Sequence, residues 1–484
     1  MIVRELDVPP GVLRQLAARH PQRYPVLLDS AADGPLGRTS VLVAMPTGAL
    51  WLDEHWRLQA EGRVPREVVG GSGGSTVAGE APPRKGFLTA LEHWVAIDRG
   101  DAGAAEGAAD LPFSGGWAVF LSYELAAEIE PRLALPRPSA SQRWHAFALR
   151  VQCALTHEKL SGRVQAIAED GAAAQMLHVI ESEALALARA GTALTGTPRP
   201  LEVAGVREED PAAYLERVRR GKEYIRAGDV YQANLSRLWR VELRGDADVG
   251  ALYERLRAVN PAPFAALAQW RGGAVLSSSP ERLVRVVGRR IETRPIAGTR
   301  PRSREPGQDA REIAALAAHP KERAEHIMLI DLERNDLGRI CEPGTVRVEE
   351  LMCIESYAHV HHIVSSVTGM LREDVTPVGV VRAVFPGGTI TGCPKHRCMQ
   401  IIAELEGEGR GAYTGSIGLI GRSGDMDLNI LIRTLTLAGR TIEFRAGAGI
   451  VADSDPQREL EETRAKARGL LAAFGTVPQA GAAV

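Results

Sequence analysis

Apolar runs of strand length recur along the whole chain and constrain its fold more than any other feature. Few of these runs are separated by a segment with helical periodicity. A parallel sheet built from βαβ units needs a crossover between successive strands, so this order favours an α+β architecture over a doubly wound one. The strand candidates are residues 24–31, 40–46, 116–125, 145–155, 230–243, 264–270, 273–279, 281–294, 414–421, 425–439 and 441–452.

Helical periodicity marks a smaller number of segments. The clearest is 211–229, which has Pro211 near its first turn and Gly228 at its end. The other helix candidates are residues 172–190, 309–337, 396–406 and 456–474. Stretches rich in Gly, Pro, Ser or other small residues are predicted to be loops or linkers, and they lie at about 61–86, 100–110 and 190–210.

The charge balance and the cysteine pattern exclude several classes of function. The chain has 484 residues, with 58 basic and 60 acidic side chains and a formal net charge of -2. We therefore expect no nucleic-acid partner and no membrane contact, and no apolar run is long enough to span a bilayer. The five cysteines are irregularly spaced and the N-terminus lacks the apolar core of a signal peptide. These features predict a cytoplasmic protein with reduced thiols.

Three glutamates on two predicted helices are candidates for a divalent-metal site. Glu459 and Glu462 lie three residues apart and share a helix face, whereas Glu325 lies on an earlier helix. Carboxylate oxygens are the ligands that Mg²⁺ prefers, with positions left for water and substrate. From spacing alone, the commoner role of exposed glutamates in surface salt bridges is favoured.

Two glycine-containing turns are candidates for binding an anion. In RAGAGIVADSD, Gly447 and Gly449 would let backbone amides approach a carboxylate closely. In GGTITGCPKHR, Thr391 precedes a helix whose N-terminal amides could do the same beside two basic residues. A tight turn after a strand and an ordinary capped helix are the simpler interpretations.

A third segment combines a carboxyl group with a basic turn. In SSSPERLVRVVGRRIETRPIAGTRPR, Glu281 could act as an acid or a base, and residues 296–299 form a turn among arginines. His361 and His362 alternate on a predicted strand, so one of them is expected to face inward. A hairpin edge and a hydrogen-bonded core histidine are the alternatives.

These weak signals occur together in strings that are similar to one family. From about Pro211 to Phe474 the chain closely resembles the chorismate-utilising enzymes, which include the component I chains of anthranilate synthase and aminodeoxychorismate synthase, isochorismate synthase and salicylate synthase. The N-terminal region matches more loosely, through RYPVLLDS and LPFSGGWAVFLSYEL. The strings that carry the resemblance are VYQANLSR, SSSPERL, TRPIAGTRPR, AEHIMLIDLERNDLGR, FPGGTITGCPK, YTGSIG, LNILIRT, AGAGIVADS and EETRAKA.

The resemblance implies a fold and a division of the chain. The fold would be α+β, with large antiparallel or mixed β-sheets packed as a sandwich and helices outside. Residues 1–200 would form an N-terminal region with the tryptophan pocket and partner contacts. Residues 211–475 would form the chorismate-binding catalytic region, and residues 476–484 a flexible tail.

The resemblance also implies chorismate as substrate and Mg²⁺ as cofactor. Chorismate is a dianion, and two like charges about 4 Å apart repel by about 4 kcal/mol at an effective dielectric constant near 20, so the metal must lie between the substrate and its carboxylate ligands. The implied metal ligands are Glu325, Glu459 and Glu462. The implied substrate-binding residues are Gly298, Thr299, Tyr413, Arg433, Gly447, Ala448, Gly449 and Lys466. The implied catalytic residues are Glu281, His362, Thr391 and Gln232.

Gln232 indicates the nucleophile. Water-using members of the family carry a lysine general base at this position, and a glutamine amide cannot deprotonate water. This argues for ammonia as the nucleophile. The chain shows no glutaminase region, so a separate glutamine amidotransferase subunit would supply the ammonia. A bound L-tryptophan is a further implied ligand, and its pocket would involve Ser30, Arg38, Pro263 and Phe264.

The choice between the two ammonia-using branches rests on conflicting residues. YTGSIG, HVHHIVSS and MDLNILIRT are more similar to aminodeoxychorismate synthase. Ala297 in PIAGT instead resembles anthranilate synthase, because many aminodeoxychorismate synthases carry a lysine there that attacks C2 of chorismate, and a methyl group cannot. Weighing the strings above the single position, we predict formation of 4-amino-4-deoxychorismate for 4-aminobenzoate and folate, with anthranilate synthesis as the alternative.

Overall fold

The computed structural model describes the backbone of every predicted site residue. The predicted tail at 476–484, the predicted loop at 100–110 and parts of the other two predicted loops lie outside the described residues. The described residues are 1–32, 34, 36–69, 86–99, 112–138, 142–191, 201–303, 305–357 and 360–475.

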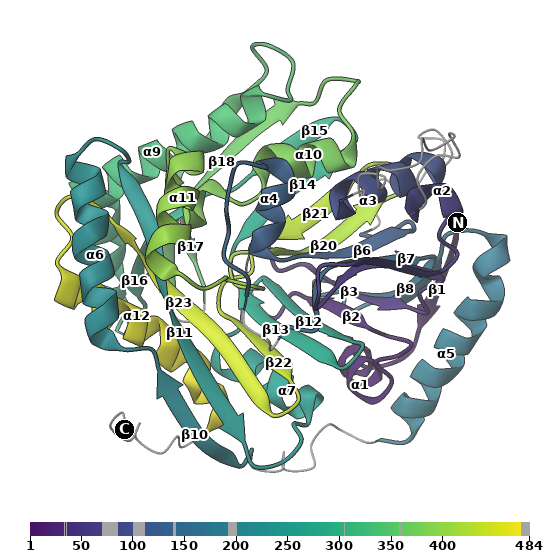
Figure 1. Ribbon diagram of the computed structural model, residues 1–484. Helices are drawn as coiled ribbons and strands as arrows, with labels where there is room; N and C mark the ends of the chain where they lie inside the picture. The colour runs from purple at the N-terminus through teal and green to yellow at the C-terminus, as the bar shows by residue number, and fades with distance from the viewer. Residues whose placement is uncertain are drawn as a thin grey trace.

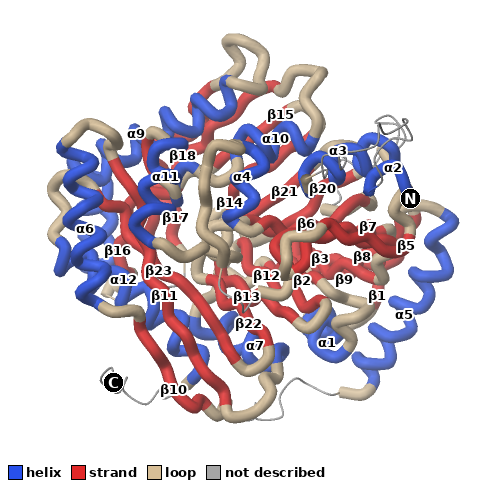
Figure 2. The backbone as a smooth tube through the Cα atoms, viewed as in Figure 1, coloured by secondary structure: helices blue, strands red, loops and turns tan. Residues whose placement is uncertain are grey.

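Two large antiparallel sheets form the framework, here called sheet I and sheet II (Figures 1 and 2). In spatial order, sheet I contains β1 (Ile2–Leu6), β9 (Val164–Ala168), β8 (Cys153–Glu158), β3 (Thr39–Ala44), β2 (Val26–Asp29), β12 (Phe264–Trp270), β13 (Gly273–Ser279), β22 (Thr434–Ala438), β23 (Thr441–Ile450), β11 (Gln232–Leu243) and β10 (Val203–Glu208), with β19 (Gly392–Cys393) paired to β11. Sheet II contains β16 (Ile296–Pro301), β18 (Val360–Met370), β15 (Arg290–Thr293), β14 (Arg282–Val287), β21 (Met426–Asn429), β20 (Ser416–Gly421), β6 (Gly116–Leu121), β7 (Trp144–Val151), β4 (Gly48–Asp53) and β5 (Leu58–Gly62), with β17 (Arg347–Ser356) paired to β18.

The helices lie outside the two sheets, as the tube drawing shows most clearly (Figure 2). The α-helices are α1 (Gly11–Arg19), α2 (Arg66–Val69), α3 (Phe87–Ile97), α4 (Ala126–Ile129), α5 (Ala174–Arg189), α6 (Pro211–Arg226), α7 (Val249–Val259), α8 (Pro306–Ala318), α9 (Pro320–Gly338), α10 (Pro377–Val384), α11 (Lys395–Glu406) and α12 (Pro456–Leu471). Short 3₁₀ turns lie at η1 (Tyr123–Leu125), η2 (Gly171–Ala173), η3 (Gly388–Ile390) and η4 (Ala472–Phe474). Within the described residues, no helix has both the length and the apolar composition needed to cross a bilayer.

Apolar clusters show how the layers pack. One cluster joins the inner faces of the sheets, with Phe120 and Phe147 of sheet II against Ala266 and Val275 of sheet I. A second cluster lies between sheet I and helices α1, α5, α7 and α12. A third lies between sheet II and helices that include α3, α9, α10 and α11. The predicted α+β sandwich with outer helices is therefore confirmed.

Several helix starts follow directly from the local sequence. Asp210, Asp455 and Thr376 each accept a backbone N–H of the first turn through a side-chain oxygen, and each is followed by proline at the first helical position. Proline suits this position because the first N–H of a helix has no intrahelical partner and the ring already holds a helical φ angle. Helices α6, α12 and α10 are fixed in register by this pattern.

One predicted strand is divided between the two sheets. The run 425–439 becomes β21 in sheet II and β22 in sheet I, and the chain crosses between them at residues 430–433. Arg433 has a φ angle of 51°, in the left-handed region that ends extended structure. Strands from before and after residue 200 lie in both sheets, so the predicted N-terminal and catalytic regions share the same layers.

A buried ion pair joins these layers near the end of α11. The side chains of Arg410 and Glu406 are 2% and 1% exposed, with 2.7 Å between guanidinium and carboxylate. Arg410 also donates to the carbonyl oxygens of Ile390 and Asn234 at 3.1 and 2.6 Å. Burial raises the pKa of Glu406, but Arg410 and Arg445 outweigh burial and hold it below its usual value.

Removing the charge of Glu406 tests this pair. Glu406→Gln would leave two guanidinium groups buried without their counter-charge, so the free energy of unfolding should fall by about 3–5 kcal/mol. Glu404→Gln on the same helix is the matched control, because its partner Arg220 is exposed and the loss should be within about 1 kcal/mol. Urea unfolding of both variants checks this, and equal losses would contradict it.

Candidate active site

Two crossings of the chain between the sheets lie side by side and form the centre of the site. Glu281 lies between β13 of sheet I and β14 of sheet II, and Arg433 lies between β21 and β22. The backbone N–H of Ile430 donates to the carbonyl of Glu281 at 3.0 Å, and that of Ser278 donates to the carbonyl of Arg433 at 3.1 Å. Both predicted residues are therefore fixed by backbone bonds at the junction of the sheets.

Glu281 is buried and holds its proton at neutral pH. Its side chain accepts a hydrogen bond from the Thr389 hydroxyl at 2.6 Å, and the backbone N–H of Ile296 also donates to it. Burial raises the pKa of Glu281 to about 8, which exceeds the opposing effects of these hydrogen bonds and of Arg433. A carboxylic acid in this state can donate a proton to a leaving group.

The two threonines of the turn GGTITG make different contacts. Thr389, which was not among the predicted site residues, contacts Glu281. The predicted Thr391 is fully buried, and its hydroxyl donates to the carbonyls of Gly387 and Gly388 at 3.0 and 3.3 Å. The two threonines are two residues apart in the sequence, and only the path of η3 distinguishes their roles.

His362 lies beside the Gly298–Thr299 turn. It is opposite Thr299 in the register between β16 and β18, and the backbone of Gly298 hydrogen-bonds to it. Burial and then Arg433 lower the pKa of His362 to about 4, so its ring is neutral at pH 7. Gly298 has a φ angle of 70°, and a Cβ there would lie 2.5 Å from Glu322, so only glycine fits.

The expectation that only one of the two histidines faces inward is wrong. His361 and His362 are 0% and 2% exposed. His361 contacts the Ser356 hydroxyl at 2.7 Å and the Asp309 carboxylate at 2.9 Å. Alternation does not separate a buried face from an exposed one here, because helices α8 and α9 both pack against β18.

Gln232 connects the start of β11 to a predicted metal ligand. Its amide nitrogen donates to Glu325 at 2.7 Å, and its amide oxygen is buried without a hydrogen bond to the described residues. The backbone of Gly449 runs directly against this amide, and a Cβ at Gly449 would collide with it. The side chain is therefore held rigidly between the helix α9 and the strand β23.

The glycines of β23 let polar side chains approach the strand closely. Gly447, Ala448 and Gly449 pair with Ser236, Leu235 and Asn234 of β11. A Cβ at Gly447 would lie 2.8 Å from the Tyr413 hydroxyl, and burial raises the pKa of that hydroxyl to about 12. The Lys466 ammonium donates to the Gly447 carbonyl at 2.8 Å. Tyr413, Lys466 and the segment 447–449, which are all predicted to bind substrate, thus meet at β23.

The three predicted metal ligands do not form one cluster among the described residues. Glu325 on α9 bonds to Gln232, whereas Glu462 on α12 pairs with Lys466 at 2.8 Å and is half exposed. Glu459, in the first turn of α12, is buried. The donor chemistry nevertheless fits Mg²⁺, because all three side chains are carboxylates. The buried amide oxygen of Gln232, beside Glu325, makes no hydrogen bond to the described residues and could also bind a cation.

The predicted tryptophan-pocket residues lie where the N-terminal strands meet β12. The Ser30 hydroxyl donates to the carbonyls of Thr39 and Pro263 at 2.7 and 3.3 Å. The carbonyl of Phe264 accepts from the Asn429 amide at 3.0 Å. Arg38 is exposed, whereas the other three are brought together. A ligand at this place stays a prediction.

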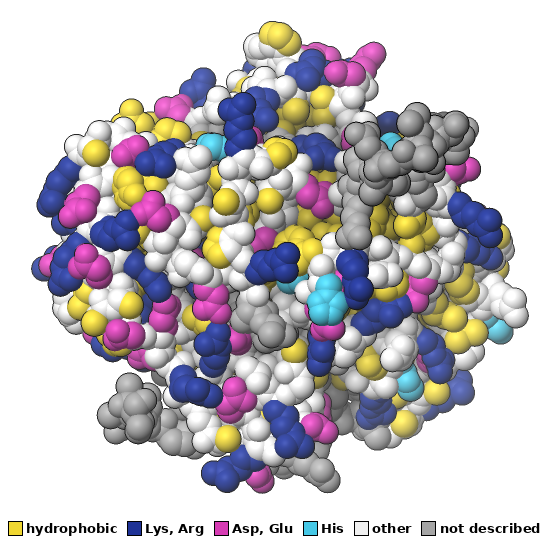
Figure 3. Space-filling model, viewed as in Figure 1, with side chains coloured by type: hydrophobic (Ala, Val, Ile, Leu, Met, Phe, Trp, Pro, Cys, Tyr) yellow, Lys and Arg dark blue, Asp and Glu magenta, His cyan; other side chains and the backbone are white. Residues whose placement is uncertain are grey.

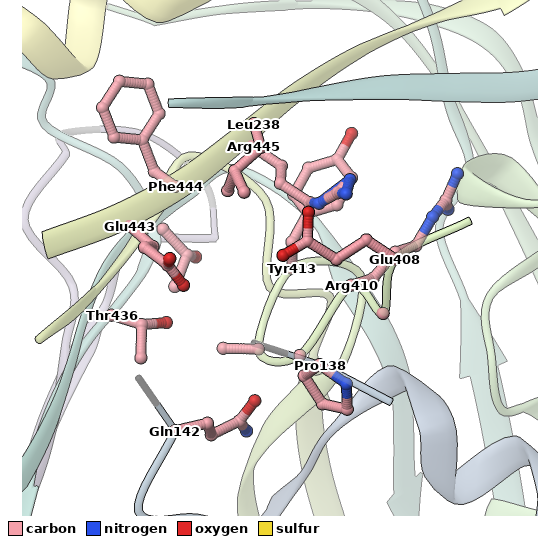
Figure 4. A pocket seen from close by; sticks show the side chains of 14 residues that line it. Pro138, Gln142, Leu238, Glu408, Arg410, Tyr413, Thr436, Glu443, Phe444 and Arg445 are labelled. Atoms are coloured by element: carbon pink, nitrogen blue, oxygen red, sulfur yellow. The ribbon is translucent and has the colours of Figure 1, made fainter. Parts of the chain in front are cut away.

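Two pockets flank the site. The first has about 380 Å³ of empty space and is lined by Tyr413, Arg410, Arg445 and Glu443 among others (Figure 4). Tyr413 is the only predicted site residue in its described lining. The second has about 1480 Å³ of open space between α4, α9, α10 and α11, where hydrophobic side chains appear on the surface (Figure 3). Its lining includes Tyr231, which precedes Gln232.

Comparisons with known proteins agree with one family. An anthranilate synthase component I-like protein of Synechocystis is 49% identical over 277 residues, 57% of this chain and 56% of that protein. Anthranilate synthase component 1 1 of Haloarcula marismortui is 39% identical over 471 residues, 92% of this chain and 94% of the relative. An aminodeoxychorismate synthase of Streptomyces griseus is 41% identical over 407 residues, 81% of this chain and 54% of the relative.

A solved structure and a family model complete the comparison. The crystal structure of anthranilate synthase component I from Streptococcus pneumoniae is 28% identical and covers 90% of this chain and 92% of that one, with a TM-score of 0.72. The family model described as chorismate binding enzyme matches residues 64–472, which include most of the strands of both sheets and the crossings that carry Glu281 and Arg433. The chain therefore belongs to the chorismate binding enzymes.

Proposed function

We propose that the chain is the chorismate-converting component of an anthranilate synthase. Ala297 carries this proposal. It is 7% exposed and follows Ile296, whose N–H bonds to Glu281, so the position at which a lysine of the aminodeoxychorismate branch would attack C2 is next to the contact with the proposed acid and carries only a methyl group. A methyl group cannot form that covalent bond, which leaves C2 open to ammonia. The relatives also favour anthranilate synthesis over the branch that the sequence strings favoured.

The chemistry divides between acid and base groups. Ammonia forms a C–N bond at C2 while the C4–O bond breaks, and protonated Glu281 donates its proton so that the hydroxyl leaves as water. The new ammonium group at C2 then gives up one proton, which restores the proton that Glu281 donated. Neutral His362 is available to accept the C2 proton as the C3–O bond breaks. The enolpyruvyl group then leaves as the enolate of pyruvate, which takes up that proton at its methylene carbon to give pyruvate.

The metal and the cations would hold the substrate. A Mg²⁺ ion bound by Glu325, Glu459 and Glu462 would supply positive charge for the dianion and Lewis acidity at the departing oxygen. Arg433 brings a guanidinium beside Glu281, and the segment 447–449 brings its backbone close to Tyr413 and Lys466. Ammonia would come from a separate glutamine amidotransferase subunit.

Formation of 4-amino-4-deoxychorismate is the second candidate. The Streptomyces griseus relative supports it, as do the strings YTGSIG and MDLNILIRT. Glu281 serves both reactions, since each expels the C4 hydroxyl. The two reactions differ in where the amino group remains, so the product distinguishes them.

Product identification tests the proposal. The protein is incubated with chorismate, Mg²⁺ and ammonium at alkaline pH, where more ammonia is unprotonated. Anthranilate fluorescence should appear without added aminodeoxychorismate lyase. It should disappear when EDTA removes the Mg²⁺. If 4-aminobenzoate forms only after aminodeoxychorismate lyase is added, and no anthranilate appears, the second candidate is correct.

Glu462→Gln tests the metal ligands. The substitution keeps the shape of the side chain but removes its charge, so the Mg²⁺ concentration for half-maximal chorismate consumption should rise by on the order of tenfold or more. Glu461→Gln is the control, because Glu461 is also half exposed and pairs with a cation on the same helix, Arg464. Similar Mg²⁺ dependence in both variants would exclude Glu462 as a ligand.

Ala297→Lys tests whether position 297 faces the ring. The new amine should compete with ammonia at C2, so anthranilate formation should fall and mass spectrometry should detect a chorismate-derived adduct on the protein. Ala297→Met has a side chain of similar length without the amine and should form no adduct. An unchanged product and rate in Ala297→Lys would show that this position does not face the substrate.

A further inference from the structure

A second buried carboxyl group, that of Glu333, is linked to Glu281 through the turn η3. Glu333 is on α9, two helical turns beyond Glu325, and is 5% exposed. The backbone N–H of Gly388 donates to its carboxylate, and its Oε1 would lie 3.3 Å from a Cβ added at Gly388. The next residue, Thr389, donates to Glu281. The turn η3 is therefore held by Glu333 on one side and bonded to Glu281 on the other.

Charged groups on α9, on α11 and at the crossing that carries Arg433 face Glu333 or Glu281. Lys395 at the start of α11 forms an ion pair with Asp336, and both face Glu333. Arg339 at the end of α9 faces Asp336. Arg433 faces Glu281. Glu333 thus interacts both with a partly buried lysine and with the proposed acid.

We propose that Glu333 is a positioning residue for the acid step: its negative charge keeps the proton on Glu281 in alkaline solution, and its bond to Gly388 holds the Thr389 turn in place. This inference rests on the proposed role of Glu281 as the acid that protonates the leaving hydroxyl. It gives a function to a carboxyl group that does not itself contact the reacting atoms.

The charge of Glu333 acts on the pKa of Glu281. Burial raises the pKa of Glu333 to about 7, with Asp336 adding to the shift and Lys395 opposing it. Burial raises the pKa of Glu281 to about 8, and the charge of Glu333 adds to that shift. Once Glu333 is ionised, its negative charge disfavours a second negative charge nearby. Removing the Glu333 charge should therefore lower the pKa of Glu281.

The pH profile of Glu333→Gln tests this inference. Chorismate consumption is measured from pH 6 to 10 with the concentration of unprotonated ammonia held constant, so that only the enzyme titrates. The midpoint of the alkaline loss of activity should move to lower pH by about one unit in Glu333→Gln. Glu333→Asp keeps the charge and should keep the midpoint within about half of that shift.

The controls separate this role from a structural one. Asp331→Asn removes an exposed carboxylate from the same helix, paired with Arg334, and should leave the midpoint unchanged. A uniform fall in rate at all pH values in Glu333→Gln, with the wild-type midpoint, would overturn the inference. Thermal unfolding of each variant identifies any loss of folding.

An infrared titration keeps the inference testable without turnover. The protonated carboxyl band of Glu281, assigned by its loss in Glu281→Gln, should titrate at lower pH in Glu333→Gln than in wild type. An unshifted band would overturn the inference. Failure of wild type to consume chorismate with ammonia would instead disprove the proposed function.

Discussion

The buried ion pair of Arg410 and Glu406 is the interaction on which the rest of the site depends. Its guanidinium joins the end of α11 to the carbonyls of Ile390 and Asn234, which belong to the turn and the strand that carry site residues. The Glu124 carboxylate, from the N-terminal region, accepts the backbone N–H groups of Arg410 and Gly411. Charges at 1–2% exposure are tolerable only when every partner is present, so this network specifies one arrangement.

The same sheet geometry places the carboxyl group of Glu281 and the guanidinium group of Arg433. Glu281 and Arg433 lie where two neighbouring chain segments leave one sheet and enter the other, a place that is buried yet has few ladder hydrogen bonds to make. Burial there keeps Glu281 protonated and His362 neutral at pH 7. The proposed proton donor and proton acceptor are thus both placed by the crossings, and the effect that we propose for Glu333 acts on the donor.

Much of the fold and part of the site could be read from the residues. The Asp–Pro and Thr–Pro helix starts, the strand runs and the glycines of β23 are local features, since capping, periodicity and close approach need only neighbouring residues. Glu281, His362, Arg433 and the 298–299 turn were named from strings and lie together around the crossings.

The tertiary structure decided what short-range patterns cannot contain. A run such as 425–439 looks like one strand, because its alternation continues while the chain changes sheets. Thr389, rather than its neighbour Thr391, reaches Glu281 because of the path of η3, and Glu333 became visible only when α9 packed against that turn. The sequence by itself determined many of the element types and indicated candidate reactive residues, since these depend on side-chain chemistry and local backbone preference. Which carboxyl group keeps its proton was decided by burial and by charges far away in the chain.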